Sequence, residues 1–235
     1  MMKLRSANHC GKADYGWLQA RYTFSFGHYF DPELMGFKTL KVLNQEIIAP
    51  DNAFQPRVYP HVDILNIILQ GHAEYRDNLG NVISAKQGEC VSFSPRPDLS
   101  YSEHNICSKT PLTRLQLWLN ACPEQESLPP QKLSLSEQEN RLIASPDGEE
   151  QSLQLRQKIW ISQIYLAPNQ SKTISLRGKH AYLQSIYGGL HVIGKEPKLL
   201  TMNCNDGVFV QEENQLTLKS EKAFRGLLID IGEQF

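Results

Sequence analysis

The sequence predicts a mostly β protein that contains two copies of one β-barrel. Short segments rich in Ile, Val, Leu and aromatic residues recur along the 235 residues, and turn residues bound them, which is typical of strands. One pattern of strands and glycines occurs in each half of the chain, as expected of a duplicated unit. A segment rich in Pro, Glu and Ser lies between the halves, where a linker is expected.

The predicted strands follow one another with short gaps. In the first half they fall within residues 39–48, 63–77, 88–94 and 113–121, and in the second half within 153–166, 181–194 and 206–211. The segments RDNLGN (76–81) and MNCNDG (202–207) supply Asn, Asp and Gly for tight turns. Ser136 and Glu139 have the spacing of a helix capping box, which predicts one short helix.

The repeat sets the expected domain boundaries. Gly71 and Gly88 lie 17 positions apart in the first half, and Gly189 and Gly207 lie 18 positions apart in the second half. A strand, a turn and a second strand occupy each interval. We therefore expect one barrel in residues 1–122 and another in 142–235, joined by a linker, 123–141, that carries the short helix.

The charge balance argues against partners that bind through bulk electrostatics. The formal net charge is -1, and no long run of either sign occurs, so neither nucleic acid nor a membrane surface is an expected partner. No apolar stretch approaches the roughly 20 residues that span a bilayer. The first residues lack the apolar core of a signal peptide, so we expect a cytoplasmic protein.

Two longer stretches resemble a known family. GWLQARYTFSFGHYFDPELMGFKTLKVLNQEIIAP (16–50) is similar to the amino-terminal signature of the pirin family. LIASPDG (142–148), followed by SLQLRQKIWISQIYLAPNQ (152–170), is similar to the opening of the second pirin barrel. The resemblance implies a bicupin, that is, two antiparallel cupin or jelly-roll barrels in one chain, and leaves function to the site.

The resemblance also implies a metal site, whose ligands this sequence changes. Typical pirins hold iron or another divalent metal through a T-H-P-H segment and the first and third residues of H-S-E-Y-N. Counted back from the shared Gly71, the T-H-P-H segment falls on residues 56–59, and the H-S-E-Y-N segment falls on residues 101–105. Glu103 is kept, whereas Arg57, Tyr59 and Tyr101 replace the three histidines.

These replacements predict that the inherited metal site is lost and that no cofactor is bound. A guanidinium has no lone pair to donate and repels a cation, and a phenol near its normal pKa is a poor ligand for a divalent ion. We expect Arg57 instead to pair with Glu103 inside the barrel.

A displaced metal site is the alternative. Strand alternation predicts that Arg57, Tyr59, His61 and Asp63 share one face, so His61 and Glu103, with Asp63, are candidate ligands for Fe, Ni, Cu or Mn. Asp63 and Glu103 could also form a pair of carboxylates. His104 has the opposite parity from Glu103 and is expected to point outward.

The five cysteines are odd in number and form no C-x-x-C pair, so free thiols are expected. Cys122, where a strand ends at the linker, is the first candidate for a redox-active thiol, followed by Cys107, Cys10 and Cys204. Cys90 lies within a predicted strand and is expected to be buried and inert.

Two functions from different classes follow. The first is a metal-free, non-enzymatic bicupin that acts in stress or redox response through a thiol or a ligand, with a small anion held by Arg57 as one variant. The second is a metal-dependent oxidoreductase, similar to quercetin dioxygenases, with its site at His61 and Glu103. The second barrel is expected to be structural, and its packing within one chain favours a monomer over a dimer. No protein partner is indicated.

Overall fold

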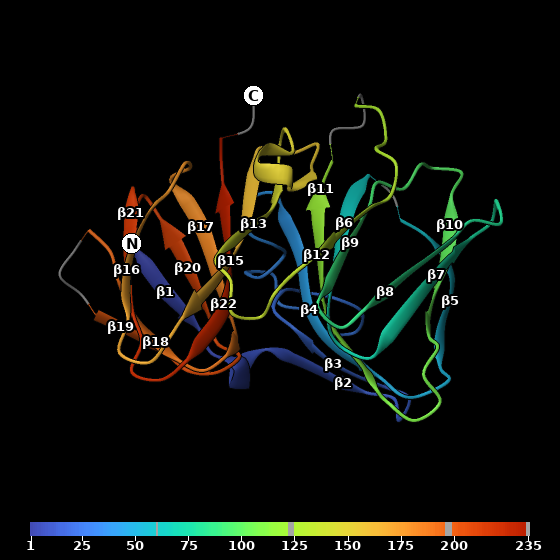
Figure 1. The fold of residues 1–235 in the computed structure, drawn as a ribbon, viewed down its shortest axis with the longest axis horizontal. Coiled ribbons are helices and arrows are strands. Elements are labelled where there is room, and N and C mark those ends of the chain that lie inside the picture. Colours follow the sequence, from blue (N-terminus) through green and yellow to red (C-terminus); the bar gives the residue numbers. More distant parts are fainter. Residues whose placement is uncertain (60, 122–124, 196–198, 234–235) are drawn as a thin grey trace. The chain divides into compact units, whose positions relative to one another are not determined.

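The computed structural model describes residues 1–59, 61–121, 125–195 and 199–233. The chain divides into two compact units, one formed by residues 11–135 and the other by residues 1–10 together with 136–235. Strands dominate both units (Figure 1), and the helices of the described residues are two short 3₁₀ turns, η1 (Ala7–His9) and η2 (Glu149–Gln151). The predicted mostly β class is therefore confirmed.

The strands of residues 11–135 are β2 (Gly11–Asp14), β3 (Leu18–Tyr22), β4 (Leu40–Ile48), β5 (Ala53–Val58), β6 (Val62–Gln70), β7 (His72–Asp77), β8 (Val82–Lys86), β9 (Glu89–Phe93), β10 (Ser100–Asn105), β11 (Leu112–Asn120) and β12 (Gln131–Ser134). The strands of the other unit are β1 (Met2–Arg5), β13 (Arg141–Ser145), β14 (Leu153–Gln154), β15 (Ile159–Leu166), β16 (Ser171–Ser175), β17 (His180–Tyr187), β18 (Leu190–Ile193), β19 (Leu199–Met202), β20 (Gly207–Gln211), β21 (Gln215–Lys219) and β22 (Phe224–Ile231).

Each unit consists of a large sheet and a small sheet around an apolar core. In residues 11–135 the seven-stranded sheet has the order β12-β9-β6-β11-β4-β3-β2, and the four-stranded sheet has the order β5-β10-β7-β8. Ile64 and Leu112 of the large sheet share one core with Phe54, Ala73 and Tyr75 of the small sheet. Burial of both inner faces from water holds the two sheets together.

The other unit repeats this arrangement. Its sheets have the orders β1-β20-β17-β22-β15-β13-β14 and β16-β21-β18-β19, so β4 to β11 of the first unit correspond one by one to β15 to β22 of the second. The pairs are antiparallel except for β13 with β14. Leu183, Val208 and Leu228 of its large sheet pack with Leu190 and Leu216 of its small sheet. The predicted duplication is confirmed.

Gly71 closes the β6–β7 hairpin in a conformation that requires glycine. Its φ is +85°, and a Cβ atom there would lie 2.7 Å from the carbonyl oxygen of Pro111. Both facts explain why this turn carries glycine, since other residues are strained at positive φ.

The domain boundaries differ from the predicted ones at both edges of the first barrel. Residues 1–10 belong with the second unit, because β1 pairs antiparallel with β20, from Met2 opposite Val210 to Arg5 opposite Gly207. Residues 131–134 of the predicted linker are strand β12, which pairs with β9 and places Leu133 opposite Cys90. In both cases a short edge strand is added to a large sheet.

The short helix predicted at Ser136 is wrong. Residues 137 and 138 form a turn. The carbonyl oxygens of Ser136 and Glu139 instead accept hydrogen bonds from Gln163 Nε2, at 2.6 and 2.8 Å. The side chain of Gln163 thus bonds the carbonyl oxygens that would accept hydrogen bonds within a helix, so the capping-box spacing does not lead to a helix here.

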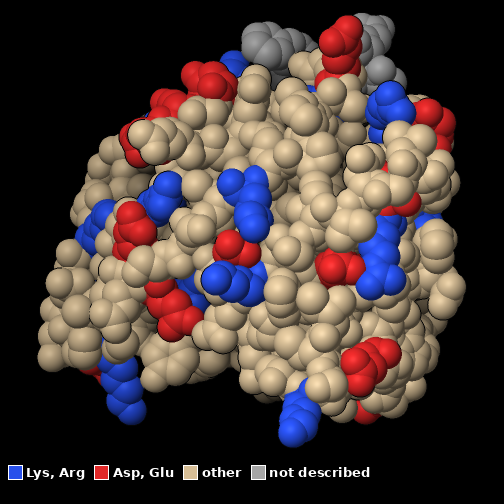
Figure 2. Space-filling view, turned by 45° about the vertical axis from the view of Figure 1, so that its right-hand side comes forward, with Lys and Arg blue, Asp and Glu red and all other residues tan. Residues whose placement is uncertain are grey.

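The surface carries interspersed charge. On the face shown in Figure 2, Lys and Arg side chains lie among Asp and Glu side chains. Within the described part of the chain, no helix has the length and apolar character needed to cross a membrane.

Candidate functional site

A pocket of about 290 Å³ lies within the first barrel, between its two sheets. Its walls are largely aromatic and include Trp17, Tyr22, Phe54 and Trp118. Four charged side chains also line it: Glu46, Arg57, Glu103 and Arg114. Such a mixture of apolar walls and a few convergent polar groups is typical of small-ligand sites.

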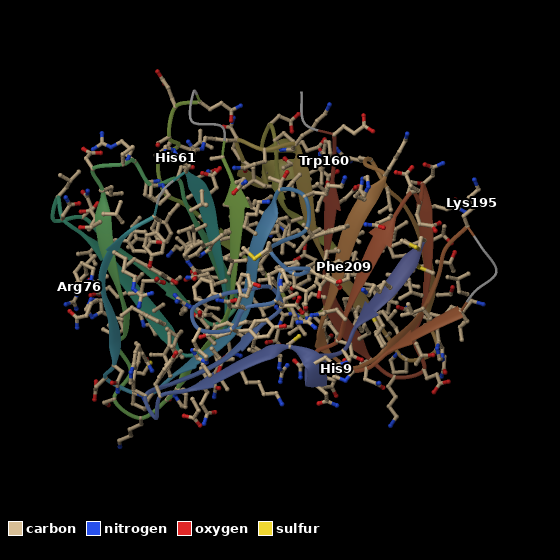
Figure 3. All side chains as sticks on the ribbon, turned by 180° about the vertical axis from the view of Figure 1, so that it is seen from behind. His9, His61, Arg76, Trp160, Lys195 and Phe209 are labelled. Carbon is tan, nitrogen blue, oxygen red and sulfur yellow. The ribbon has the colours of Figure 1, made fainter. Side chains whose placement is uncertain are left out.

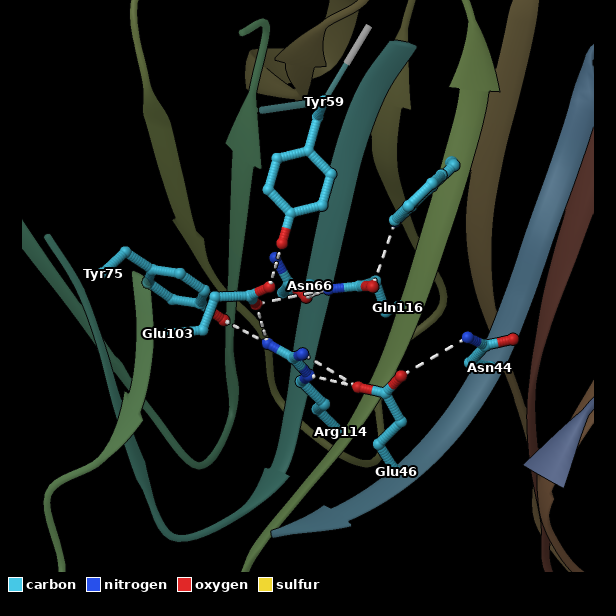
Figure 4. A network of polar contacts seen from close by, with 9 residues as sticks. Asn44, Glu46, Tyr59, Asn66, Tyr75, Glu103, Arg114 and Gln116 are labelled. Carbon is cyan, nitrogen blue, oxygen red and sulfur yellow. Dashed lines mark hydrogen bonds and ion pairs between the residues drawn. The ribbon is translucent and has the colours of Figure 1, made fainter. Parts of the chain in front are cut away.

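Arg114 on β11 lies at the centre of a buried polar network (Figure 4) and is 1% exposed. Its Nε and Nη2 atoms donate to Glu46 Oε2 on β4 at 3.0 and 2.8 Å. Its Nη1 atom donates to Glu103 Oε2 on β10 and, at 3.4 Å, to the hydroxyl of Tyr75. Burial alone would lower the pKa of Arg114, but the two carboxylates outweigh it and raise that pKa well above its usual range. Arg114 therefore stays charged.

Both carboxylate oxygens of Glu103 are occupied. Oε1 accepts a hydrogen bond from the Tyr59 hydroxyl at 2.7 Å, and Oε2 accepts from Gln116 Nε2 at 3.3 Å as well as from Arg114. Gln116 in turn donates to Asn66 Oδ1 at 3.0 Å. A buried carboxylate with this many donors is fixed in position and compensated in charge.

The two tyrosines at family histidine positions stack on each other. The ring centroids of Tyr59 and Tyr101 lie 4.7 Å apart with an interplanar angle of 21°. Burial first, and the Glu103 carboxylate second, raise the pKa of both phenols well above that of free tyrosine. Neither is a phenolate at neutral pH, so neither offers the anionic oxygen that binds a metal well.

The predicted pair between Arg57 and Glu103 is wrong, because Arg114 takes that place. A register shift between Tyr101 and Glu103 sets Arg57 opposite Tyr101 and Phe54 opposite Glu103. Arg57 is exposed, and its guanidinium carbon lies 5.3 Å from the centroid of the Phe54 ring. No carboxylate among the described residues pairs with it.

Arg114 and Glu46 were not predicted as site residues, although the sequence carries a signal for them. In β11 the residues Arg114, Gln116 and Trp118 alternate with leucines, and β11 lies at the centre of the large sheet. Polar residues at every second position of a central strand lie on one buried face of the sheet, where each of them needs a hydrogen-bonding or charged partner. Glu46 lies directly opposite Arg114 in the ladder.

The displaced ligand set around His61 is not assembled. His61 is exposed, lies at one end of β6 (Figure 3) and has a left-handed φ of 51°, so the predicted strand face is interrupted there. Asp63 is buried on the face of β6 opposite the core residues Ile64 and Ile68, and it accepts a hydrogen bond from Ser94 Oγ at 2.5 Å. The predicted pairing of Asp63 with Glu103 is therefore wrong.

His104 follows its prediction. It lies next to Glu103 on β10 and takes the opposite side of the strand, half-buried, where its Nε2 atom is 2.8 Å from Ser102 Oγ. Burial, and then the nearby Arg76, lower the pKa of His104 below its usual value.

The side chains at the family's metal positions do not fit a divalent metal in this arrangement. The single carboxylate, Glu103, is already bound by a guanidinium and a phenol. A cation entering beside it would meet the positive charge of Arg114. In the described ranges, no three His, Cys, Asp or Glu side chains gather as metal ligands would.

The thiol candidates differ in exposure. Cys122 lies outside the described residues. Cys204 is exposed, whereas Cys10 and Cys107 are half-buried. Cys90 is fully buried as expected, and burial raises the pKa of its thiol. The redox activity of these thiols stays a prediction.

Comparison with known proteins identifies the family. Residues 3–119 match the model of the pirin family, and residues 142–231 match the model described as the quercetinase C-terminal cupin domain. The chain is 53% identical to the pirin-like protein YhaK of Escherichia coli K12 over 231 residues, which cover 98% of this chain and 99% of that protein. The chain belongs to the pirin family. Its two matched domains and duplicated barrels confirm the predicted bicupin fold.

The chain is also similar, at lower identity, to a dioxygenase and to a pirin crystallised with nickel. The chain is 28% identical to the quercetin 2,3-dioxygenase of Escherichia coli K12 over 235 residues, which cover 98% of this chain and 99% of that protein. It is also similar to the crystal structure of the bacterial pirin YhhW from Escherichia coli in complex with nickel(II), with a TM-score of 0.90, 27% identity and full coverage of both chains. A shared fold does not by itself establish a shared function.

Proposed function

We propose that the first barrel of this pirin-family protein works without a metal and binds a small organic anion, as a non-enzymatic ligand-binding protein. The observation that carries the proposal is the position of Arg114, whose guanidinium lies between Glu46 and Glu103. The barrel thereby holds a fixed positive charge beside the one ligand that it shares with the family's metal site.

A metal would have to break this network in order to bind. Glu103 would need to give up its hydrogen bonds to Tyr59 and Gln116 and its ion pair with Arg114. Removing one partner from a buried ion pair costs up to about 3–5 kcal/mol, and Arg114 would keep Glu46 as its remaining carboxylate. This cost opposes metal binding in the first barrel.

Arg57 supplies the attraction for an anion. Arg114 already compensates Glu46 and Glu103, so Arg57 is the charged residue of the pocket that lacks a carboxylate partner among the described residues. It lies over the Phe54 ring, beside the aromatic walls. A cavity of about 290 Å³ suits a small ligand, and we expect a planar carboxylate of about one ring.

Benzoate is a suitable probe for this site. Ligand efficiencies of small molecules give an expected dissociation constant on the order of 1 mM. At about 10 mM benzoate the free energy of unfolding should then rise by roughly 1.4 kcal/mol, and the midpoint of thermal unfolding by about 3–5 °C.

Arg57→Gln should abolish this shift, while Arg96→Gln should preserve it, because Arg96 is also an exposed arginine of this unit but lies outside the pocket. An equal shift in both variants, or no shift in the wild type, would refute anion binding by Arg57.

A metal-dependent oxidoreductase is the second candidate, favoured by the full-length similarity to quercetin 2,3-dioxygenase. It requires a rebuilt site at His61 and Glu103. The test is quercetin consumption by the protein supplied with Fe, Ni, Cu or Mn, with the Escherichia coli dioxygenase as positive control. Turnover that is lost in His61→Ala and Glu103→Ala would favour this candidate. Cytoplasmic location and a monomeric state stay predictions from the sequence.

A further inference from the structure

A pocket of about 240 Å³ lies in the second barrel, within residues 136–235. Its walls come from β13, β15 and β22 of the large sheet and from β16 of the small sheet. Trp160 on β15 (Figure 3) and Ile174 on β16 line it and are half-buried, so each presents apolar surface to the pocket. The sequence predicts only a structural role for this barrel, yet the pocket gives it room for a small molecule.

Lys172 places a positive charge on the inner face of β16. It lies two positions before Ile174, which packs against the apolar core, so strand alternation turns both side chains to the same face. Lys172 is half-buried, lines the pocket and has no ion-pair partner among the described residues. A partly desolvated ammonium group without a counter-charge favours the binding of an anionic group.

Three other charged side chains of the pocket already have contacts within the protein. Arg177 pairs with Glu149. The buried Asp230 carboxylate accepts hydrogen bonds from the backbone nitrogens of Arg177 and Gly178, at 2.6 and 2.9 Å. Arg141 also interacts within the protein. These contacts hold the three charged groups in place at the pocket walls.

Glu150 supplies an unpaired charge of the opposite sign. It is exposed, lines the pocket and has no ion-pair partner in the described ranges of the chain. Glu150 and the next residue, Gln151, have left-handed φ values of 54° and 60°. Such backbone strain in non-glycine residues gathers at ligand sites. Lys172 and Glu150 thus bring two opposite, unpaired charges to one small pocket, which favours a ligand that carries both signs.

We propose that the second barrel binds a small zwitterion, namely a free α-amino acid with an aliphatic side chain. Lys172 binds the carboxylate of the ligand, and Glu150 binds its ammonium group. The aliphatic side chain contacts Trp160 and Ile174. A ligand with a single charge leaves one of the two charged side chains without a partner, so the pair sets the specificity. The pocket shares no lining residue with the arginine pocket of the first barrel, so this proposal is independent of the anion site there.

Leucine and two analogues that each lack one charge test the proposal by titration in protein-detected NMR spectra. Isocaproate lacks the ammonium group of leucine, and isoamylamine lacks its carboxylate. We expect saturable binding of leucine with a dissociation constant on the order of 1 mM. Each analogue should bind about fivefold more weakly, because it loses one of the two charged contacts.

Lys172→Gln should weaken leucine binding about fivefold by removing the charge that holds the carboxylate. Lys219→Gln is the matched control, because Lys219 is exposed on β21 of the same small sheet but does not line the pocket. Since Lys172 has no ion pair to lose, both variants should keep the midpoint of thermal unfolding of the wild type.

Glu150→Gln should weaken leucine binding to a similar extent. Glu212→Gln is its control, because Glu212 is also an exposed carboxylate at a left-handed position, with a φ of 56°, but lies outside the pocket. Both control variants should bind leucine as the wild type does.

The proposal is overturned if leucine does not saturate the protein, or if either analogue binds as tightly as leucine. It is also overturned if Lys172→Gln binds leucine as Lys219→Gln does, or if Glu150→Gln binds it as Glu212→Gln does. Arg57→Gln should leave leucine binding unchanged, so failure here is distinct from failure of the anion proposal.

Discussion

At the scale of single residues, Arg114 is the side chain on which the first barrel depends most. It is buried and compensates two buried carboxylates, Glu46 and Glu103. Arg114→Met leaves both buried negative charges without a compensating cation, so we expect the free energy of unfolding to fall by about 3–5 kcal/mol. Chemical denaturation followed by circular dichroism measures this loss.

The control for Arg114→Met is Arg96→Met. Arg96 also pairs with a carboxylate, that of Asp98, but both side chains are more than half exposed. Exposed ion pairs contribute little to stability because water and salt screen them. Equal losses in the two variants would contradict the role given to the buried network.

Tyr59→Phe tests the hydrogen bond that holds Glu103. The Tyr59 hydroxyl donates to Glu103 Oε1 at 2.7 Å, and a hydrogen bond to a charged group contributes about 1.5–3 kcal/mol. We expect the variant to lose stability in that range while keeping its stacking on Tyr101. A fully stable Tyr59→Phe would show that Gln116 and Arg114 suffice to hold the carboxylate.

Sequence reasoning singled out residues that lie together in the first barrel but did not predict how they pair. Tyr59, Tyr101 and Glu103 do come together, as the resemblance implied. Arg57 was assigned the wrong partner because one irregularity in the β5–β10 register is invisible in the sequence. Arg114 was missed because its role in the site follows from its ion pair with Glu46, which lies 68 positions away along the chain. His61 was misplaced because its positive φ breaks the strand alternation.

At the scale of elements, the edge strands β1 and β12 distinguish the two compact units from the predicted domains. The fragment 11–135 keeps β12 beside β9, whereas the fragment 1–122 lacks β12 and carries β1 away from β20. We therefore predict that 11–135 unfolds at a higher urea concentration than 1–122. The fragment 1–122 is expected to be less stable because loss of β12 exposes backbone groups and apolar surface at the edge of its large sheet. Equal midpoints would contradict it.

Most central strands could be predicted and the edge strands could not, for a physical reason. β6, β11 and β15 lie within segments rich in Ile, Leu and aromatic residues, which are typical of strands, whereas β22 was not predicted, because Arg225, Gly226 and Asp230 interrupt its apolar residues. β1 and β12 have four residues each with mostly polar side chains, and partners distant in sequence make them strands. The capping box at Ser136 failed for the same reason, since Gln163 supplies the competing hydrogen bonds.

At the scale of the whole molecule, the chain combines the architecture of its pirin relatives with a buried polar network in its first barrel. Its strand order is duplicated, and its similarity to pirin relatives extends over nearly its whole length. The relatives include both a pirin-like protein and a quercetin 2,3-dioxygenase, so the architecture alone does not decide the activity. Under the proposed function, the side chains of Arg57, Tyr59, Tyr101 and Arg114 determine what the first barrel binds.

The most direct test of a metal-free first barrel is the metal content per chain. Untagged protein is purified without chelator, and elemental analysis is repeated after incubation with ferrous iron and with nickel, with the Escherichia coli pirin YhhW treated in parallel. We predict that YhhW retains nickel while this protein holds far less than one metal per chain, because Arg114 occupies the vicinity of Glu103. Near-stoichiometric metal that is lost in Glu103→Ala would contradict a metal-free barrel.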